Sequence, residues 1–215
     1  MPVSEDLRVR FREIPRETRN DHQDFAIRVW RGISWLERGE NLEADDLEGR
    51  FLALWIGLNA LYGQLDRDGR PWGDREALAA FISRIYPLDS SGRLRAVIAK
   101  HQKAALSLID NKYLFEGFWA ESKTAKADLG QEVKSAILML TKPNQLPLWR
   151  MLLSRLYLMR NQIFHGASTK GSALNRKSLR NCVTVLAGFL PASLETMIEY
   201  GVTQDWGEVC YPPRE

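Results

Sequence analysis

Apolar residues recur along most of this chain at steps of three and four positions, the spacing that places them on one face of an α-helix. The spacing predicts helices over residues 17–39, 46–62, 74–85, 91–108, 123–141, 148–165 and 174–190, with a turn or short helix over 191–200. Residues 1–16 mix charges with two prolines and are expected to form an extended N-terminal arm, and residues 201–215 a C-terminal tail. Alternating β patterns are absent. The sequence therefore predicts an all-α fold in a single domain, 1–215.

Two of the expected helices are apolar on nearly every face, over residues 51–62 and 148–160. A helix of this kind needs neighbours all round, so both are expected in the middle of a helical bundle. Asn59 is a polar exception in the first run, and a buried amide needs hydrogen-bond partners. It either bonds to the backbone of a facing helix or supports the region around Arg160.

Capping residues mark several helix ends. Asp45 or Asp46 is expected to cap the helix that contains residues 51–62, and Ser90 or Ser91 the helix over 91–108. Gly166 is well placed to end the second apolar helix. A proline at position 191 is expected to end the last long helix.

Charge is distributed unevenly although the formal net charge is only +3. Between Glu132 and Glu195 there is no Asp or Glu, whereas nine Lys and Arg fall there, leaving 21 basic and 27 acidic residues elsewhere. A basic third of this kind could present a positive face to phosphates, although solvated helix faces explain it equally well.

The N-terminus lacks a secretory pattern and the chain holds only two cysteines, which predicts a reducing cytoplasm. No uninterrupted apolar stretch reaches the roughly 18 to 20 residues that span a bilayer, so no membrane segment is expected.

The strongest candidate for chemistry is the polar group that closes the second apolar helix: Arg160, Asn161 and His165. Asn161 and His165 are four residues apart and share a helix face, while Arg160 lies about 140° from His165 around the axis. Ile163 and Phe164 are expected to anchor the turn in the core. A guanidinium fork fits phosphate oxygens, an amide can orient an oxygen, and imidazole can transfer a proton near neutral pH. These groups suit cleavage of RNA, which carries its own nucleophile in the 2′-hydroxyl.

Other residues are candidates for supporting roles. Four basic residues that follow the cluster could contact RNA backbone, although exposed helix cations are the ordinary explanation: Lys170, Arg176, Lys177 and Arg180. Trp72, in a loop with Arg67 and Arg70, could stack on a base. No paired Cys or His ligands, phosphate-binding Gly loop or dinucleotide fingerprint is present, so neither a metal nor another cofactor is expected.

The motif Arg160-Asn161-x-x-x-His165 resembles the Arg-x(4 to 6)-His signature of the HEPN superfamily of helical ribonucleases. The helix over residues 50–63 is also similar to the leading helix of Apea-like HEPN domains. The resemblance implies an up-and-down antiparallel bundle with additional helices here, and a homodimer whose two motifs share one cleft. It also implies metal-independent RNA cleavage, with a role as a toxin or defence effector and a possible antitoxin or defence-system partner. Ala167 stands where one toxin subgroup has a tyrosine, so the control through that tyrosine is not expected.

Three hypotheses follow for function. The first is a metal-independent endoribonuclease that uses Arg160, Asn161 and His165. The second is a non-catalytic module that holds RNA or a nucleotide in the same basic groove. The third is a helical interaction protein whose motif serves a dimer interface.

Overall fold

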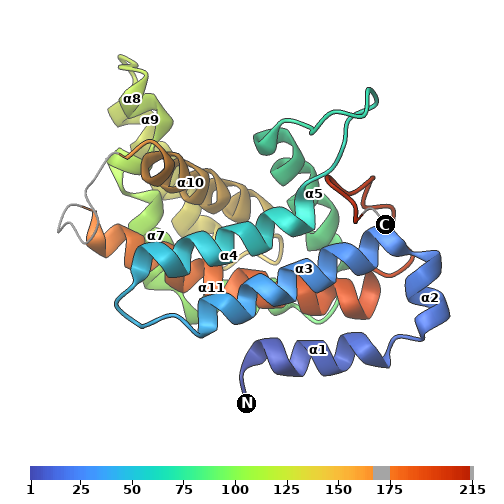
Figure 1. Ribbon diagram of the computed structural model, residues 1–215. Coiled ribbons are helices and arrows are strands. Elements are labelled where there is room, and N and C mark those ends of the chain that lie inside the picture. Colours follow the sequence, from blue (N-terminus) through green and yellow to red (C-terminus); the bar gives the residue numbers. More distant parts are fainter. Residues whose placement is uncertain (167–174, 214–215) are drawn as a thin grey trace.

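The computed structural model describes residues 1–166 and 175–213 and confirms the all-α class (Figure 1). The helices are α1 (Val3–Glu13), α2 (Arg16–Asp21), α3 (Gln23–Glu40), α4 (Leu47–Tyr62), α5 (Asp74–Leu88), α6 (Arg93–Lys100), α7 (Gln102–Ile109), η1 (Lys112–Leu114), α8 (Glu116–Trp119), α9 (Ala125–Met139), α10 (Leu146–Phe164) and α11 (Arg176–Tyr200). Within the described residues the only β-type pairings are two isolated bridges, both at the loop after α4.

The core is built around α4, α10 and α11. The two helices expected to be central are indeed buried, and α4 packs along α3 on one side and α11 on the other (Figure 1). Trp149 of α10 contacts Phe189 of α11, with ring centroids 4.5 Å apart. The α3–α4 contact is close because two glycines face it. A Cβ at Gly32 would lie only 2.8 Å from Leu61 Cδ2 of α4, and a Cβ at Gly57 would lie 3.4 Å from the Gly32 carbonyl oxygen.

The expectation of an extended N-terminal arm was wrong, because residues 3–13 form α1 and residues 16–21 form α2. Leu7 and Phe11 are four residues apart, which places them on one helical face, and both are buried. Phe11 meets Phe25 of α3 with centroids 6.4 Å apart. Burial of this narrow apolar face stabilises the segment as a helix, although the rest of its surface is charged.

Pro191 does not end the last helix, which runs unbroken from Arg176 to Tyr200. A proline inside a helix removes one backbone hydrogen bond and costs about 3 kcal/mol. Residues on both sides of Pro191 are buried, including Leu190 and Leu194. Their packing outweighs that cost.

The expected N-terminal cap is present on α4 but not on α6. Asp46 caps α4 and accepts a hydrogen bond from the Gly49 amide at 2.9 Å, which confirms one of the two candidates. Neither Ser90 nor Ser91 caps the later helix. Asp89 instead accepts bonds from the amides of residues 93 and 94, and the chain enters α6 through Gly92 at φ 70°.

The C-terminal segment 201–213 lies against the bundle. Trp206 and Val209 are buried, and the Val209 amide donates to Asp24 at 2.7 Å. Arg28 and Arg31 of α3 bond to backbone carbonyls of the segment. The segment thereby closes one side of the molecule beside the loop after α4.

By length and composition alone, α11 is the one helix in residues 1–166 and 175–213 that could cross a bilayer. Of its most apolar stretch, 72% is buried inside the bundle. This degree of burial is typical of a helix in the core of a bundle.

Candidate functional site

The cluster predicted from the sequence lies at the C-terminal end of α10. Pro147 stands in the first turn of this helix, where its missing amide hydrogen costs nothing. The helix ends because Gly166 takes a left-handed conformation at φ 65° and its amide returns to the Ile163 carbonyl at 3.1 Å. Gly166 therefore ends the helix as expected, and this places His165 at the last helical turn.

Arg160 and Asn161 are in direct contact. The Arg160 guanidinium donates to Asn161 Oδ1 at 3.0 Å and lies over the Phe164 ring, 4.5 Å from its centroid. Its other terminal nitrogen is 3.7 Å from Asp74 Oδ2, at the start of α5. The Nε atom is buried and has no hydrogen-bond partner among the described residues.

Asp74 is itself held in place by Tyr62, the last residue of α4. The Tyr62 hydroxyl donates to Asp74 Oδ1 at 2.8 Å. Burial, reinforced by the Asp74 carboxylate, raises the pKa of Tyr62 far above its ordinary value, so the hydroxyl stays protonated and remains a donor. Three elements thus converge on Arg160: α4, α5 and α10.

His165 is exposed, and its side chain makes no described contact with Arg160. The two residues lie about 140° apart around the helix, so Arg160 faces α4 and α5 while His165 faces solvent. One copy of the chain therefore joins Arg160 to Asn161 and leaves His165 apart. Of the two residues expected to anchor this turn, Ile163 packs against the core, but Phe164 is 57% exposed. The prediction for Phe164 was wrong, since it shares the face of Arg160 at the rim of the bundle.

A cavity of about 550 Å³ adjoins Arg160. Its walls come from α3, α4, the loop after α4, the start of α5, α10 and the C-terminal segment. They are formed by Arg31, Trp35, Ile56, Asn59, Ala60, Tyr62, Gly63, Gln64, Pro71, Trp72, Asp74, Ala77, Tyr157, Arg160, Val209, Cys210 and Tyr211. The lining combines five aromatic side chains with two guanidinium groups, one carboxylate and two side-chain amides, and such a mixture of aromatic and a few polar groups is typical of ligand pockets.

Asn59 lines this cavity together with Arg160. Its side chain bonds neither to a facing backbone nor to Arg160, and it has no hydrogen-bond partner in residues 1–166 and 175–213. The structure therefore shows neither of the two expected contacts, with the backbone of a facing helix or with Arg160. The structure instead places it in the wall of the cavity, opposite α10.

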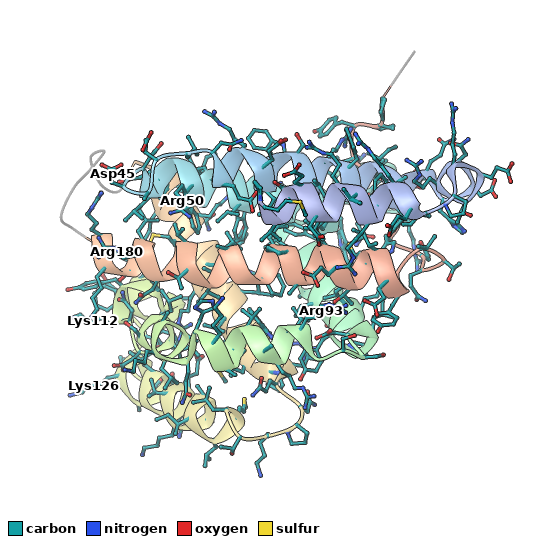
Figure 2. All side chains as sticks on the ribbon, turned by 90° about the horizontal axis from the view of Figure 1, so that it is seen from below. Asp45, Arg50, Arg93, Lys112, Lys126 and Arg180 are labelled. Atoms are coloured by element: carbon teal, nitrogen blue, oxygen red, sulfur yellow. The ribbon has the colours of Figure 1, made fainter. Side chains whose placement is uncertain are left out.

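The expected RNA-contacting residues divide into three groups. Lys177 and Arg180 are exposed on the first turns of α11, whereas Arg176 donates to the Asp45 carbonyl at 2.9 Å and lies 3.9 Å from Glu48. Lys170 lies outside the described residues. Figure 2 shows Arg180 at the same end of the molecule as Lys112 and Lys126, and Figure 1 places the end of α10 there too.

Arg155, counted in the basic segment, does not contribute to a positive surface. Its side chain is 2% exposed, donates to Glu132 at 2.6 Å and lies over the Phe115 ring. The Glu132 carboxylate balances the charge of this buried guanidinium, so Arg155 is part of the core.

Sequence reasoning missed Asp74, Tyr62 and Tyr157. Asp74 was taken only as a helix start, and the two tyrosines as core residues of apolar helices. No spacing rule connects these positions to Arg160, because they are brought together by packing between helices distant in sequence.

In the part of the chain that the structure describes, no group of three or more His, Cys, Asp or Glu could hold a metal ion.

No family model, curated protein or solved structure matches this chain.

Proposed function

We propose that this chain is a metal-independent endoribonuclease of the HEPN type that acts as a homodimer. The observation that carries the proposal is the end of α10, where the Arg160–Asn161 pair borders a cavity and an exposed His165 lies one turn further along. The exposed cations Lys177 and Arg180, with Lys112 and Lys126, give that end of the molecule a surface suited to a phosphate backbone.

The proposed reaction needs no group beyond RNA and side chains. The ribose 2′-oxygen attacks the adjacent phosphorus, forming the O2′–P bond while the P–O5′ bond breaks. One imidazole removes the 2′-hydroxyl proton and another delivers a proton to the departing 5′-oxygen, leaving a 2′,3′-cyclic phosphate and a 5′-hydroxyl. Arg160 stabilises the charge on the phosphorane oxygens and Asn161 orients one of them.

Each chain supplies a single His165, which is why the proposal includes a dimer. A two-fold axis that passes near the ends of two α10 helices would bring both imidazoles to one phosphate. Phe164, 57% exposed beside His165, is an apolar residue that such an interface would bury.

Arg160 must exchange partners for this reaction. Its ion pair with Asp74 is long, at 3.7 Å, and both side chains are 28% exposed. Ion pairs of this kind contribute only about 0 to 1 kcal/mol. A bidentate phosphate contact is stronger and can displace the carboxylate.

The test is cleavage of mixed RNA in excess EDTA by the wild type, His165→Ala, Arg160→Ala and the control His22→Ala, which alters a histidine far from α10. We expect His165→Ala and Arg160→Ala to lose 10²-fold or more of the activity, and His22→Ala to retain it. An inert wild type, or normal cleavage by both motif variants, would refute the catalytic assignment.

Mixing experiments address the dimer separately. At a constant total concentration of chains, wild type that has exchanged subunits with His165→Ala should lose activity as the square of the wild-type fraction if each site needs both imidazoles. A linear decline would refute the composite site while leaving cleavage itself intact.

A non-catalytic RNA- or nucleotide-binding module is the second candidate. It is favoured by the position of Arg160 in the cavity wall, away from His165. This alternative predicts salt-sensitive binding of RNA without product, unaffected by His165→Ala.

A further inference from the structure

The cavity beside Arg160 has the size and lining of a site for one planar polar ring. Its volume of about 550 Å³ lies within the range of ligand pockets, roughly 300 to 1,000 Å³. Trp35, Trp72 and Tyr211 stand at its rim with exposed fractions of 38%, 41% and 79%. Tyr62 and Tyr157 form part of its deeper wall. Aromatic faces in this number offer stacking surfaces on more than one side of an entering ring.

Two polar groups in the cavity wall have unused hydrogen-bonding capacity. The Asn59 amide carries a donor and an acceptor with no partner among the described residues. Arg160 Nε also has no partner among the described residues, but it is buried, so a ligand would reach it only after the guanidinium moves. Unpaired polar groups at a cavity surface indicate a ligand that carries both acceptors and donors. The edge of a nucleobase has this pattern, and Asn is among the side chains that pair with it in two bonds.

The walls of the cavity are held by hydrogen bonds to backbone carbonyls, so the site is formed before a ligand enters. Arg31 donates to the carbonyls of Cys210 and Tyr211 at 3.0 and 2.6 Å, which fixes the C-terminal wall. Next to it, the Trp72 amide donates to the Gln64 carbonyl at 2.8 Å, and Gln64 is itself bridged to Val209 of the C-terminal segment. A preformed site loses little conformational entropy on binding.

We propose that this cavity receives a nucleobase of the RNA chain, with Asn59 bonding to the base edge, Trp72 stacking on its face and Arg160 binding the attached phosphate. The inference rests on the proposed function, because it takes Arg160 as the phosphate ligand. Arg160 is also the residue proposed to stabilise the phosphorane, so the phosphate that it binds is the cleaved one. The base therefore occupies the position next to the cleaved phosphodiester and selects where the chain is cut.

The test measures binding without cleavage, in a His165→Ala background. Anisotropy of a labelled RNA hexamer and calorimetry of a nucleoside 5′-monophosphate report binding, and ribose 5-phosphate reports the contribution of phosphate alone. Trp72→Ala and Asn59→Ala are compared with Trp30→Ala, which removes an equally exposed tryptophan, 46% exposed, outside the cavity. Circular dichroism confirms that each variant is folded.

We expect Trp72→Ala to weaken hexamer binding about 5- to 150-fold, the range for loss of one base stack, and Asn59→Ala to weaken it in the same direction, with Trp30→Ala unchanged. The monophosphate should bind and ribose 5-phosphate should not. Equal binding by all three variants, or by ribose 5-phosphate, would overturn the base site. A hexamer that binds no more tightly than the monophosphate would identify a site for a free nucleotide and overturn the assignment to RNA.

Failure of this inference can be told apart from failure of the proposed function. Wild-type cleavage of RNA combined with unaltered binding by Trp72→Ala and Asn59→Ala leaves the nuclease and removes the base site. Weakened binding by both variants combined with no cleavage by the wild type leaves the base site and removes the nuclease.

Discussion

Replacement of Arg28 by Met tests how the C-terminal segment and the loop after α4 are held against the bundle. Arg28 is fully buried on α3 and donates to three backbone carbonyls: Leu61 at 3.1 Å, Gly207 at 2.9 Å and Gly63. Two of these acceptors end α4 and the third belongs to the C-terminal segment. Met has a similar length and no donor, so the variant removes all three bonds without opening a large cavity.

The magnitude follows from two opposing contributions. Hydrogen bonds from a charged donor contribute about 1.5 to 3 kcal/mol each, so three contribute about 4.5 to 9 kcal/mol. Against this, burial lowers the pKa of Arg28 from 12.5 to about 10, which corresponds to a cost of roughly 3 kcal/mol for holding the charge inside the protein. Met does not incur that cost. The difference predicts that Arg28→Met lowers the free energy of unfolding by about 1 to 6 kcal/mol, with about 3 as the central value.

Urea unfolding followed by circular dichroism and by tryptophan fluorescence measures this difference. Arg31→Met is the matched control, because Arg31 also donates to two carbonyls of the C-terminal segment but lies nearer the surface. We expect it to cost less than about 1 kcal/mol. The reasoning is refuted if Arg28→Met unfolds within about 0.5 kcal/mol of the wild type, or if Arg31→Met costs as much.

Three further predictions concern single side chains. Asp46→Ala should lose about 1 kcal/mol in urea unfolding because it removes the cap of α4, whereas Asp46→Asn should lose little. Burial raises the pKa of the Cys182 thiol, so a thiol reagent should label Cys210 first and reach Cys182 only in urea; equal rates in the native protein would contradict this. Burial and Lys100 lower the pKa of His101, so the unfolded chain takes up a proton first as the pH falls through about 6.5, and stability is lost there. His101→Gln should lessen that loss, and an unchanged pH profile would contradict it.

Helical periodicity predicted most of the fold because the large helices bury one or more whole faces. It failed for α1, where only Leu7 and Phe11 mark the buried face and charges dominate the rest. It failed again at Pro191, where local preference predicts a break and tertiary packing on both sides prevents one. In both segments, contacts with helices distant in sequence decide the structure.

The candidate site was predictable only as far as its residues are near one another in sequence. Arg160 and Asn161 are adjacent, and their contact follows from that adjacency. The Asp74 contact and the cavity depend on how α4, α5 and the C-terminal segment pack. The burial of Arg155 could have been found, since it is spaced with Leu152 and Met159 along one face of the helix.

Arg155 and Arg160, two of the three arginines of α10, differ in how easily each could exchange its carboxylate partner for the proposed phosphate. Arg155 is 2% exposed and its pair with Glu132 is short, at 2.6 Å, so an incoming phosphate would have to reach a buried guanidinium and break a short contact. Breaking a buried pair by removing one partner costs about 3 to 5 kcal/mol. Arg160 is 28% exposed, its pair with Asp74 is 1.1 Å longer, and its Nε has no partner. Exchange of Asp74 for phosphate would therefore leave a partly exposed carboxylate, 28% exposed, that still receives the Tyr62 hydrogen bond. A shift of five positions along the helix is enough to make Arg155 structural and to leave Arg160 free for the proposed phosphate contact.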